Sequence, residues 1–206
     1  ALISLFFLIL LPVMLVFPKR GLDTKSEPFN TVGIKRILLL SILSLVIYQI
    51  GLASIWSFIE RMADNAGVSI IQTGKILAMV MPLSITGSIL SAAISTKYGR
   101  VFPLLFAISG VLLGLSILGD ITSESNLFLG FLIHQVSWNF GLPYFYGLVK
   151  EFDRNGTLVT LAPGAQAFGA AIGPLITGFA VQNNGFSIVN FVSGAAVFLG
   201  VSMAIL

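Results

Sequence analysis

The chain has 206 residues, of which 56% are hydrophobic and only 9% are charged, and its formal net charge is +3. A typical globular domain has roughly 25% charged residues, whereas the mean hydropathy here is +1.01 over the whole chain. Too few charges are present to cover a water-soluble particle, so the composition predicts an integral membrane protein embedded in a lipid bilayer.

The chain contains no cysteine and a single histidine. Disulfide frameworks, thiolate metal sites and cysteine nucleophiles are therefore excluded within this chain, as is a metal site built from several histidines. We expect no metal, no cofactor and no nucleic-acid partner.

Long apolar runs without strict alternation predict helices, because a strand crosses a membrane with only about ten alternating residues. Helices also satisfy their own backbone hydrogen bonds in lipid. We expect an all-α membrane protein with seven transmembrane helices, at residues 1–17, 37–58, 70–95, 101–119, 127–149, 157–181 and 186–206.

The first run begins at Ala1 without an initiator Met, and its positive charges follow the apolar stretch. A signal peptide carries its positive charge before the apolar stretch. We interpret residues 1–17 as the end of a preceding transmembrane helix and the chain as a fragment of a larger protein.

Basic residues are distributed unevenly among the loops. Three alternate loops carry nine of them, Lys19, Arg20, Lys25, Lys35, Arg36, Lys97, Arg100, Lys150 and Arg154, whereas the other three carry only Arg61. Short loops rich in Lys and Arg stay in the cytoplasm. We therefore expect Ala1 to lie on the outer side and Leu206 at the cytoplasmic side, in a bacterial inner (plasma) membrane.

Residues 18–36 form the longest and most polar connection, which we interpret as a cytoplasmic central loop between two halves of the protein. The following residues, 37–206, would form a six-helix transmembrane domain. Two triplets, 37–119 and 127–206, each place a basic loop on the cytoplasmic side, an arrangement typical of transporters built from inverted repeats.

The loop after the third expected helix carries a motif. Residues 92–104 read AAISTKYGRVFPL, in which Lys97, Gly99 and Arg100 match the cytoplasmic sequence Gly-x-x-x-Asp-Arg-x-Gly-Arg-Arg of the major facilitator superfamily. The first Gly, the Asp and the last Arg of that motif are replaced. The chain resembles the C-terminal half of such a transporter, and the resemblance implies helices seven to twelve, a cytoplasmic gate motif and a missing N-terminal half. A plain basic turn is the alternative interpretation.

Residues 164–178 read GAQAFGAAIGPLITG. Ala165, Gly169 and Gly173 recur every four residues and make a smooth stripe for close helix packing, while Pro174 permits a bend. The segment also resembles the glycine-rich motif of exporters in the same superfamily. Structural packing is the simpler interpretation.

The expected helix 127–149 has a polar face. Its polar side chains fall within an arc of roughly 140° at about 100° per residue: His134, Gln135, Trp138, Asn139 and Tyr146. The opposite arc is apolar, with Leu129, Ile133, Val136 and Phe140. We expect the polar arc to face a cavity that binds substrate, and Gly141 and Pro143 to interrupt the helix as in transporter sites. The alternative is hydrogen bonding between helices without any ligand.

Further substrate-binding candidates lie on three other helices. Tyr48 and Gln49 project from one side of helix 37–58, together with Ser41 and Trp56, and Gln166 lies in the glycine-rich helix. Lys75 lies about one and a half turns inside helix 70–95. Its ammonium group either extends to the outer interface or faces the cavity, where it would favour an anionic substrate.

These patterns favour a secondary transporter that moves a small molecule by alternating access, not an enzyme. All eight carboxylates lie in loops or at helix ends, so a proton-coupling carboxylate would belong to the missing half unless His134 takes that role. The alternatives are a facilitative carrier or channel-like pore without ion coupling and a membrane-embedded enzyme. Against these, the sequence shows neither a repeated filter loop nor paired catalytic carboxylates.

Overall fold

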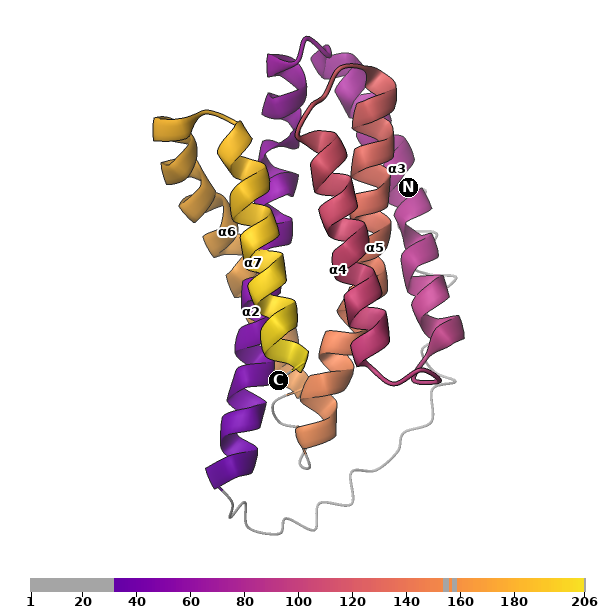
Figure 1. Ribbon diagram of the computed structural model, residues 1–206, viewed down its shortest axis with the longest axis vertical. Coiled ribbons are helices and arrows are strands. Elements are labelled where there is room, and N and C mark those ends of the chain that lie inside the picture. Colours follow the sequence, from indigo (N-terminus) through magenta and orange to yellow (C-terminus); the bar gives the residue numbers. More distant parts are fainter. Residues whose placement is uncertain (1–31, 154–155, 157–158, 206) are drawn as a thin grey trace, which may run out of the picture. The chain divides into compact units, whose positions relative to one another are not determined.

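The computed structural model describes residues 32–153, 156 and 159–205 (Figure 1). The expected helix 1–17, most of the loop 18–36, Arg154 and Leu206 lie outside the described residues. The described elements are all helical: α2 (Val32–Asn65), α3 (Ile70–Ile94), α4 (Val101–Leu118), α5 (Glu124–Phe152), the short 3-10 helix η1 (Val159–Leu161), α6 (Ala162–Asn184) and α7 (Ser187–Ile205).

Six long helices therefore occur where six were expected from residue 37 onward, and the main difference is at α2. This helix begins five residues earlier and extends seven residues beyond the predicted 37–58. Charged residues such as Glu60 and Arg61 end an apolar run without ending a helix, because both have good helix propensity. The chain turns only at Gly67, where φ is +84°.

Five of these helices are long and apolar enough to cross a membrane: Ile37–Asn65 within α2, then α3 and α4, Val159–Asn184 with α6, and α7. Helix α5 is also long, with 29 residues, but its polar residues keep it out of that set. It packs extensively against α4 and α3 and also contacts α2. The one described long helix that is not a candidate span therefore contacts three other long helices.

Helix starts follow local side-chain chemistry. Ser69 and Gln72 form a capping box at the start of α3, in which each side chain meets the backbone of the other residue. At the start of α5, the Ser123 hydroxyl accepts a hydrogen bond of 3.2 Å from the Asn126 amide. These caps satisfy backbone donors that have no partner within the first helical turn.

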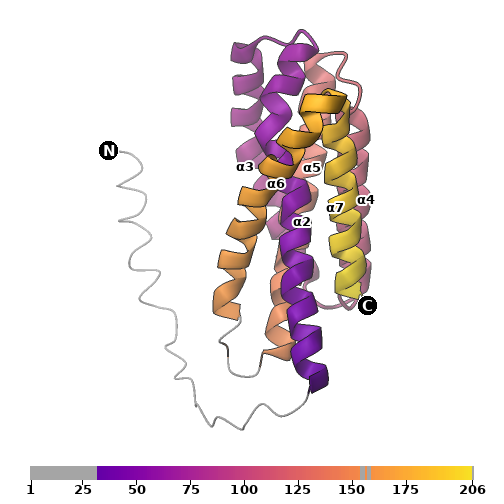
Figure 2. The same cartoon turned by 90° about the vertical axis from the view of Figure 1, so that its left-hand side faces the viewer.

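The helices pack in two groups, which Figures 1 and 2 show from two directions. Helix α2 makes its most extensive contacts with α6 and α7, and helix α5 makes its own with α3 and α4. Contacts of α2 with α5 and of α4 with α7 join the two groups. Successive long helices run antiparallel, so the loops alternate between the two ends of the bundle.

Glycines allow the closest helix contacts. A Cβ added at Gly87 of α3 would lie 2.0 Å from the Val136 carbonyl oxygen of α5. A Cβ at Gly173 of α6 would lie 2.5 Å from the Ile50 carbonyl oxygen of α2. Such distances lie far inside van der Waals contact, so only glycine lets these backbones approach so closely.

Candidate functional site

The polar residues of α5 lie inside the bundle. His134 and Gln135 are fully buried, and α4 approaches the His134 backbone closely because Gly114 has no side chain. A Cβ at Gly114 would lie 2.8 Å from the His134 amide nitrogen. The His134 ring is nearly parallel to that of Phe131, with centroids 6.3 Å apart.

His134 and Gln135 form a hydrogen-bonded pair. The Nδ1 atom of His134 lies 3.1 Å from the side-chain oxygen of Gln135. Since that oxygen is an acceptor, Nδ1 is the donor, and the Nε2 atom of a neutral ring then presents a lone pair. The pair therefore offers one free acceptor, His134 Nε2, and one free donor, Gln135 Nε2.

Several buried polar atoms of the predicted site have no hydrogen-bond partner among the described residues. They are Tyr48 Oη, Gln49 Oε1, His134 Nε2, Gln135 Nε2 and Trp138 Nε1. An unsatisfied buried donor or acceptor costs about 1–3 kcal/mol. We refer to these five residues of α2 and α5 as the polar region, and their unpartnered atoms include both donors and acceptors.

Asn139 differs from these residues because α3 binds it. Its side-chain amide donates to Ser84 Oγ at 3.0 Å and to the Gln135 carbonyl oxygen at 3.1 Å. Ser84, which the sequence analysis did not single out, is buried on α3. No local pattern distinguishes it from the other serines of that helix, because its role depends on a residue 55 positions away.

The expected interruption of α5 at Gly141 and Pro143 is wrong, because the helix continues through both residues to Phe152. Proline removes the hydrogen bond to the carbonyl four residues earlier, here that of Asn139. The Ser88 hydroxyl of α3 donates to this carbonyl oxygen at 3.3 Å. A neighbouring helix thus replaces the lost bond and the helix stays intact.

The apolar arc of α5 also differs from a simple lipid-facing surface. Leu129 is half exposed, but Phe140 is only 2% exposed and packs edge-on against Phe106 of α4, with ring centroids 5.3 Å apart. Both arcs of α5 are therefore covered by helices over much of their length. The polar arc is distinguished by its chemistry rather than by greater burial.

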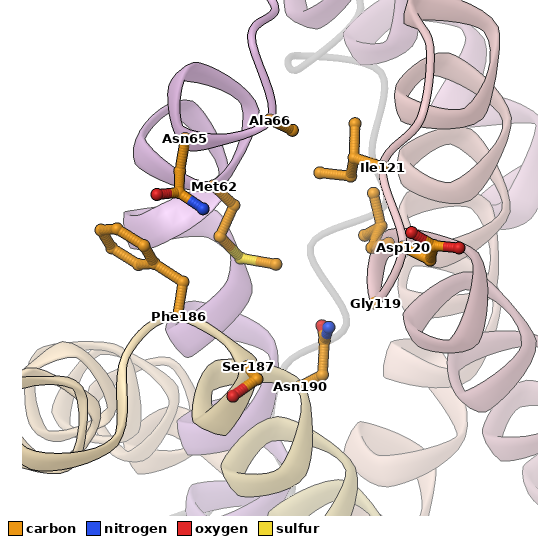
Figure 3. A pocket seen from close by; sticks show the side chains of 10 residues that line it. Met62, Asn65, Ala66, Gly119, Asp120, Ile121, Phe186, Ser187 and Asn190 are labelled. Carbon is orange, nitrogen blue, oxygen red and sulfur yellow. The ribbon is translucent and has the colours of Figure 1, made fainter.

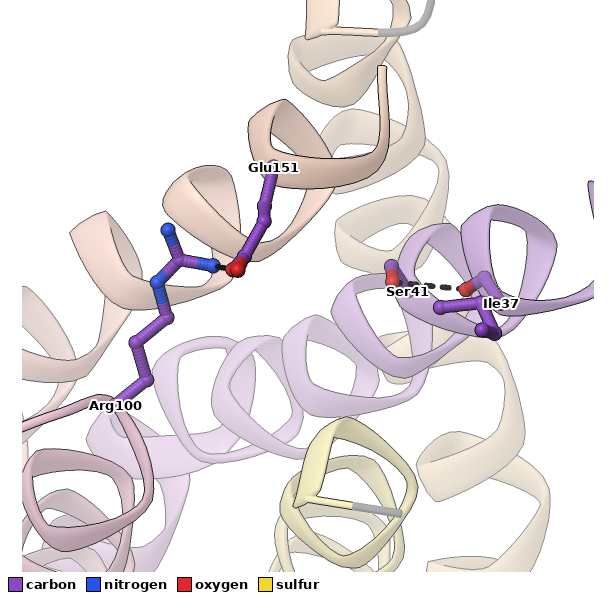
Figure 4. Close-up of polar contacts among 4 residues, drawn as sticks. All are labelled: Ile37, Ser41, Arg100 and Glu151. Atoms are coloured by element: carbon purple, nitrogen blue, oxygen red, sulfur yellow. Dashed lines mark hydrogen bonds and ion pairs between the residues drawn. The ribbon is translucent and has the colours of Figure 1, made fainter. Parts of the chain in front are cut away.

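The two candidates on α2 point toward different helices. Tyr48 stacks on Phe145 of α5 with centroids 4.4 Å apart, and its hydroxyl lies 2.8 Å from where a Cβ of Gly141 would be. The Gln49 Cβ instead faces Gly169 of α6, 3.0 Å from the corresponding position. Ser41 does not join them, since its hydroxyl donates to the Ile37 carbonyl of its own helix at 2.9 Å (Figure 4).

Gln166 is connected to α5. Its side-chain oxygen accepts a hydrogen bond of 2.5 Å from the Tyr146 hydroxyl, and both residues are partly exposed. Trp56, on α2, is 43% exposed and stacks on Phe131 with centroids 5.8 Å apart. Tyr146 and Gln166 therefore contact each other, twelve residues further along α5 than His134.

Lys75 is exposed on α3, and no hydrogen bond or ion pair joins its ammonium group to any described residue. It therefore stands apart from the buried polar region. The polar region itself contains no lysine, arginine, aspartate or glutamate among the described residues.

The basic turn between α3 and α4 is compact. Gly99 adopts a φ of +71°, which favours glycine, and Lys97 is exposed. Arg100 forms an ion pair with Glu151 near the end of α5 (Figure 4). The turn is thereby tied to the neighbouring helix.

The glycine-rich stripe of α6 packs on α2. Gly169 and Gly173 contact the backbone of α2, and one turn further the Thr177 hydroxyl donates to Ser54 Oγ at 2.7 Å. Ser54 Oγ in turn lies 3.3 Å from the Gly173 carbonyl oxygen, beside Pro174. Gly169, Gly173 and Thr177 therefore lie along one contact between α6 and α2.

No known protein family, curated protein or solved structure significantly matches this chain. The described residues form an all-helical bundle with five helices able to cross a membrane by length and composition. Such an architecture is expected of an integral membrane protein. In this bundle, uncharged polar side chains are buried on α5 and α2.

Proposed function

We propose that the chain forms the C-terminal half of a secondary active transporter similar to the major facilitator superfamily, which moves a small neutral polar molecule by alternating access. The observation that carries the proposal is the set of unpartnered buried donors and acceptors on α2 and α5. Polar groups inside a membrane bundle require polar partners, and in a carrier these are water and the transported molecule.

The helix contacts support an inverted repeat. In such a repeat, α2, α3 and α4 correspond in order to α5, α6 and α7. The extensive contacts of α2 with α6 and α7 then correspond to the contacts of α5 with α3 and α4, which are similarly extensive. The close contacts of Gly173 with α2 and of Gly87 with α5 are exchanged in the same way. Because α2 and α5 start at opposite ends of the bundle (Figure 1), the two triplets have inverted orientation, as in many transporters.

The distribution of charge supports a cytoplasmic C-terminus. The α3–α4 turn, which carries Lys97 and Arg100, and the end of α5, which carries Lys150, lie at the end of the bundle where α7 finishes (Figure 1). The end of α2, with Asp64, and the α4–α5 connection, with Asp120, lie at the opposite end. Loops rich in Lys and Arg remain in the cytoplasm. We therefore also propose that the C-terminus of the chain is cytoplasmic and that the protein lies in a bacterial inner membrane.

The proposal is tested with the full-length protein in proteoliposomes, using a panel of radiolabelled neutral solutes that includes hexoses, nucleosides and polyols. A carrier gives saturable uptake of one of them, accelerated by the same unlabelled solute inside the vesicle. Non-saturable flux with single-channel conductance would identify a pore, and conversion of the solute would identify an enzyme.

The site itself is tested with variants in that assay. Trp138→Ala or Gln135→Ala, each of which removes a donor without a partner among the described residues, should weaken apparent affinity roughly two- to tenfold, the effect of one lost neutral hydrogen bond. Leu129→Ala, on the exposed part of the same helix, is the control and should leave affinity unchanged. Equal affinities for all three variants would show that the polar residues serve only helix packing.

A further inference from the structure

A second site lies at the end of the bundle away from Lys97. A cavity of about 400 Å³ opens where α2 ends, where α4 connects to α5 and where α7 begins (Figure 3). Its apolar wall includes Met62, Leu118, Ile121 and Phe186, and its polar groups come from Asn65, Asp120, Ser187 and Asn190. None of these residues belongs to the polar region proposed for transport.

Asn190 provides an unused acceptor at this cavity. Its side chain projects into the space between α2 and the α4–α5 connection (Figure 3), and its buried Oδ1 atom has no hydrogen-bond partner among the described residues. The Nδ2 atom of the same side chain lies 3.4 Å from where a Cβ of Gly119 would be. A ligand that donates a hydrogen bond to Oδ1 would remove the cost of leaving this oxygen unpaired.

The electrostatics of the cavity favour a cation. Among the described residues, Asp120 is its only charged lining residue, and both α2 and α4 finish beside it at Asn65 and Leu118. Helix C-termini carry partial negative charge and N-termini partial positive charge. Since α3, α5 and α7 also begin at this end of the bundle, the preference for a cation rests on the Asp120 carboxylate. In the part of the chain that the structure describes, no lysine, arginine or histidine lines the cavity.

The kind of cation follows from size and from the remaining lining. A volume of about 400 Å³ falls in the range of small-molecule sites, which is about 300–1,000 Å³. One carboxylate is too few for a calcium ion, which takes six to eight oxygen ligands. An ammonium group instead donates hydrogen bonds to amide, hydroxyl and carboxylate oxygens, and the apolar wall accommodates a hydrocarbon group.

We propose that this cavity binds a small organic cation with a primary ammonium group and an apolar body. The ammonium donates to Asn190 Oδ1 and lies near the Asp120 carboxylate, while the apolar body packs against Met62 and Phe186. Such a ligand would contact α2, α7 and the α4–α5 connection together. The proposal is independent of the transported molecule.

The test uses 2-phenylethylamine, which is cationic at pH 7, and the neutral 2-phenylethanol of similar shape. Isothermal titration calorimetry measures binding to the full-length protein in detergent. The amine should bind at least twofold more tightly than the alcohol. Asp120→Asn should weaken amine binding about two- to fivefold, as expected for an exposed charge pair, and Asn190→Ala about two- to tenfold.

Two variants serve as controls. Asp64→Asn removes the same charge from the same end of the bundle, outside the cavity lining, and should leave amine binding unchanged, as should Trp138→Ala in the transport region. Absence of amine binding, equal binding of the alcohol, or equal loss in Asp64→Asn and Asp120→Asn would overturn the proposal. A loss confined to Trp138→Ala would also overturn it, by assigning the amine to the transport region.

Discussion

The Tyr146 hydroxyl of α5 donates a hydrogen bond of 2.5 Å to the side-chain oxygen of Gln166 on α6. These residues flank the connection between the two helices. The bond links the helix that carries His134 to the helix whose glycines pack on α2. It is therefore a specific polar contact between the two packing groups of the bundle.

Removing this hydrogen bond should destabilise the protein moderately. Tyr146→Phe and Gln166→Leu should each lower stability, and the double variant should lose less than the sum of the two. A neutral hydrogen bond contributes about 0.5–1.5 kcal/mol, which sets the expected coupling energy. Unfolding of the full-length protein in detergent, measured as a double-mutant cycle, gives this value. Additive effects of the two substitutions would contradict the contact.

The stripe of α6 should be intolerant of added volume. In Gly173→Ala, the added methyl group would lie 2.5 Å from the Ile50 carbonyl oxygen. Overpacking of this kind typically costs about 1–3 kcal/mol. Gly164→Ala, on the same helix, meets no described residue within 4 Å and should leave stability unchanged or improve it. Thermal unfolding of both variants measures the difference. A melting temperature of Gly173→Ala equal to that of Gly164→Ala would contradict close packing.

The orientation of the bundle can be tested by cysteine labelling, because this chain has no cysteine of its own. Single cysteines at Lys97 and Lys150 should react with a membrane-impermeant maleimide only from the cytoplasmic side, and those at Asp64 and Asp120 only from outside. All four side chains are exposed. Asp153 is a poor labelling position, since it is buried and accepts a hydrogen bond of 2.7 Å from the Val159 amide. Reaction of either pair from the opposite side would reverse the orientation.

The ion pair between Arg100 and Glu151 should contribute little to stability at high salt. The side chains are 26% and 53% exposed, and partly exposed pairs typically contribute about 0.2–1 kcal/mol. A cycle of Arg100→Gln and Glu151→Gln should give a coupling energy in that range at low ionic strength. Adding about 1 M salt should reduce it, because the screening length falls to about 3 Å. A coupling unaffected by salt would show that the contact acts by packing instead.

The positions of the six described long helices could be predicted from the sequence within a few residues at most ends. Apolar runs long enough to cross a bilayer form helices because a helix satisfies its backbone hydrogen bonds within one segment. The charged loops and the polar residues of α5 were also visible in the sequence, since both depend only on residue type and position along the chain. The helix ends were less accurate, as α2 shows, because charged residues can extend a helix beyond its apolar part.

The neighbours of each residue were decided by the tertiary structure. Pro143 predicts an interrupted helix, yet α5 continues, because Ser88 of α3 donates to the Asn139 carbonyl. Phe140 is in an apolar arc that could equally face lipid, but it is buried against α4. Hydropathy cannot separate these cases, because lipid and a protein interior are equally apolar. The sequence by itself determined which residues leave water, whereas the partners of Tyr48, Asn139 and Tyr146 depend on helices far along the chain and on glycines that let those helices meet.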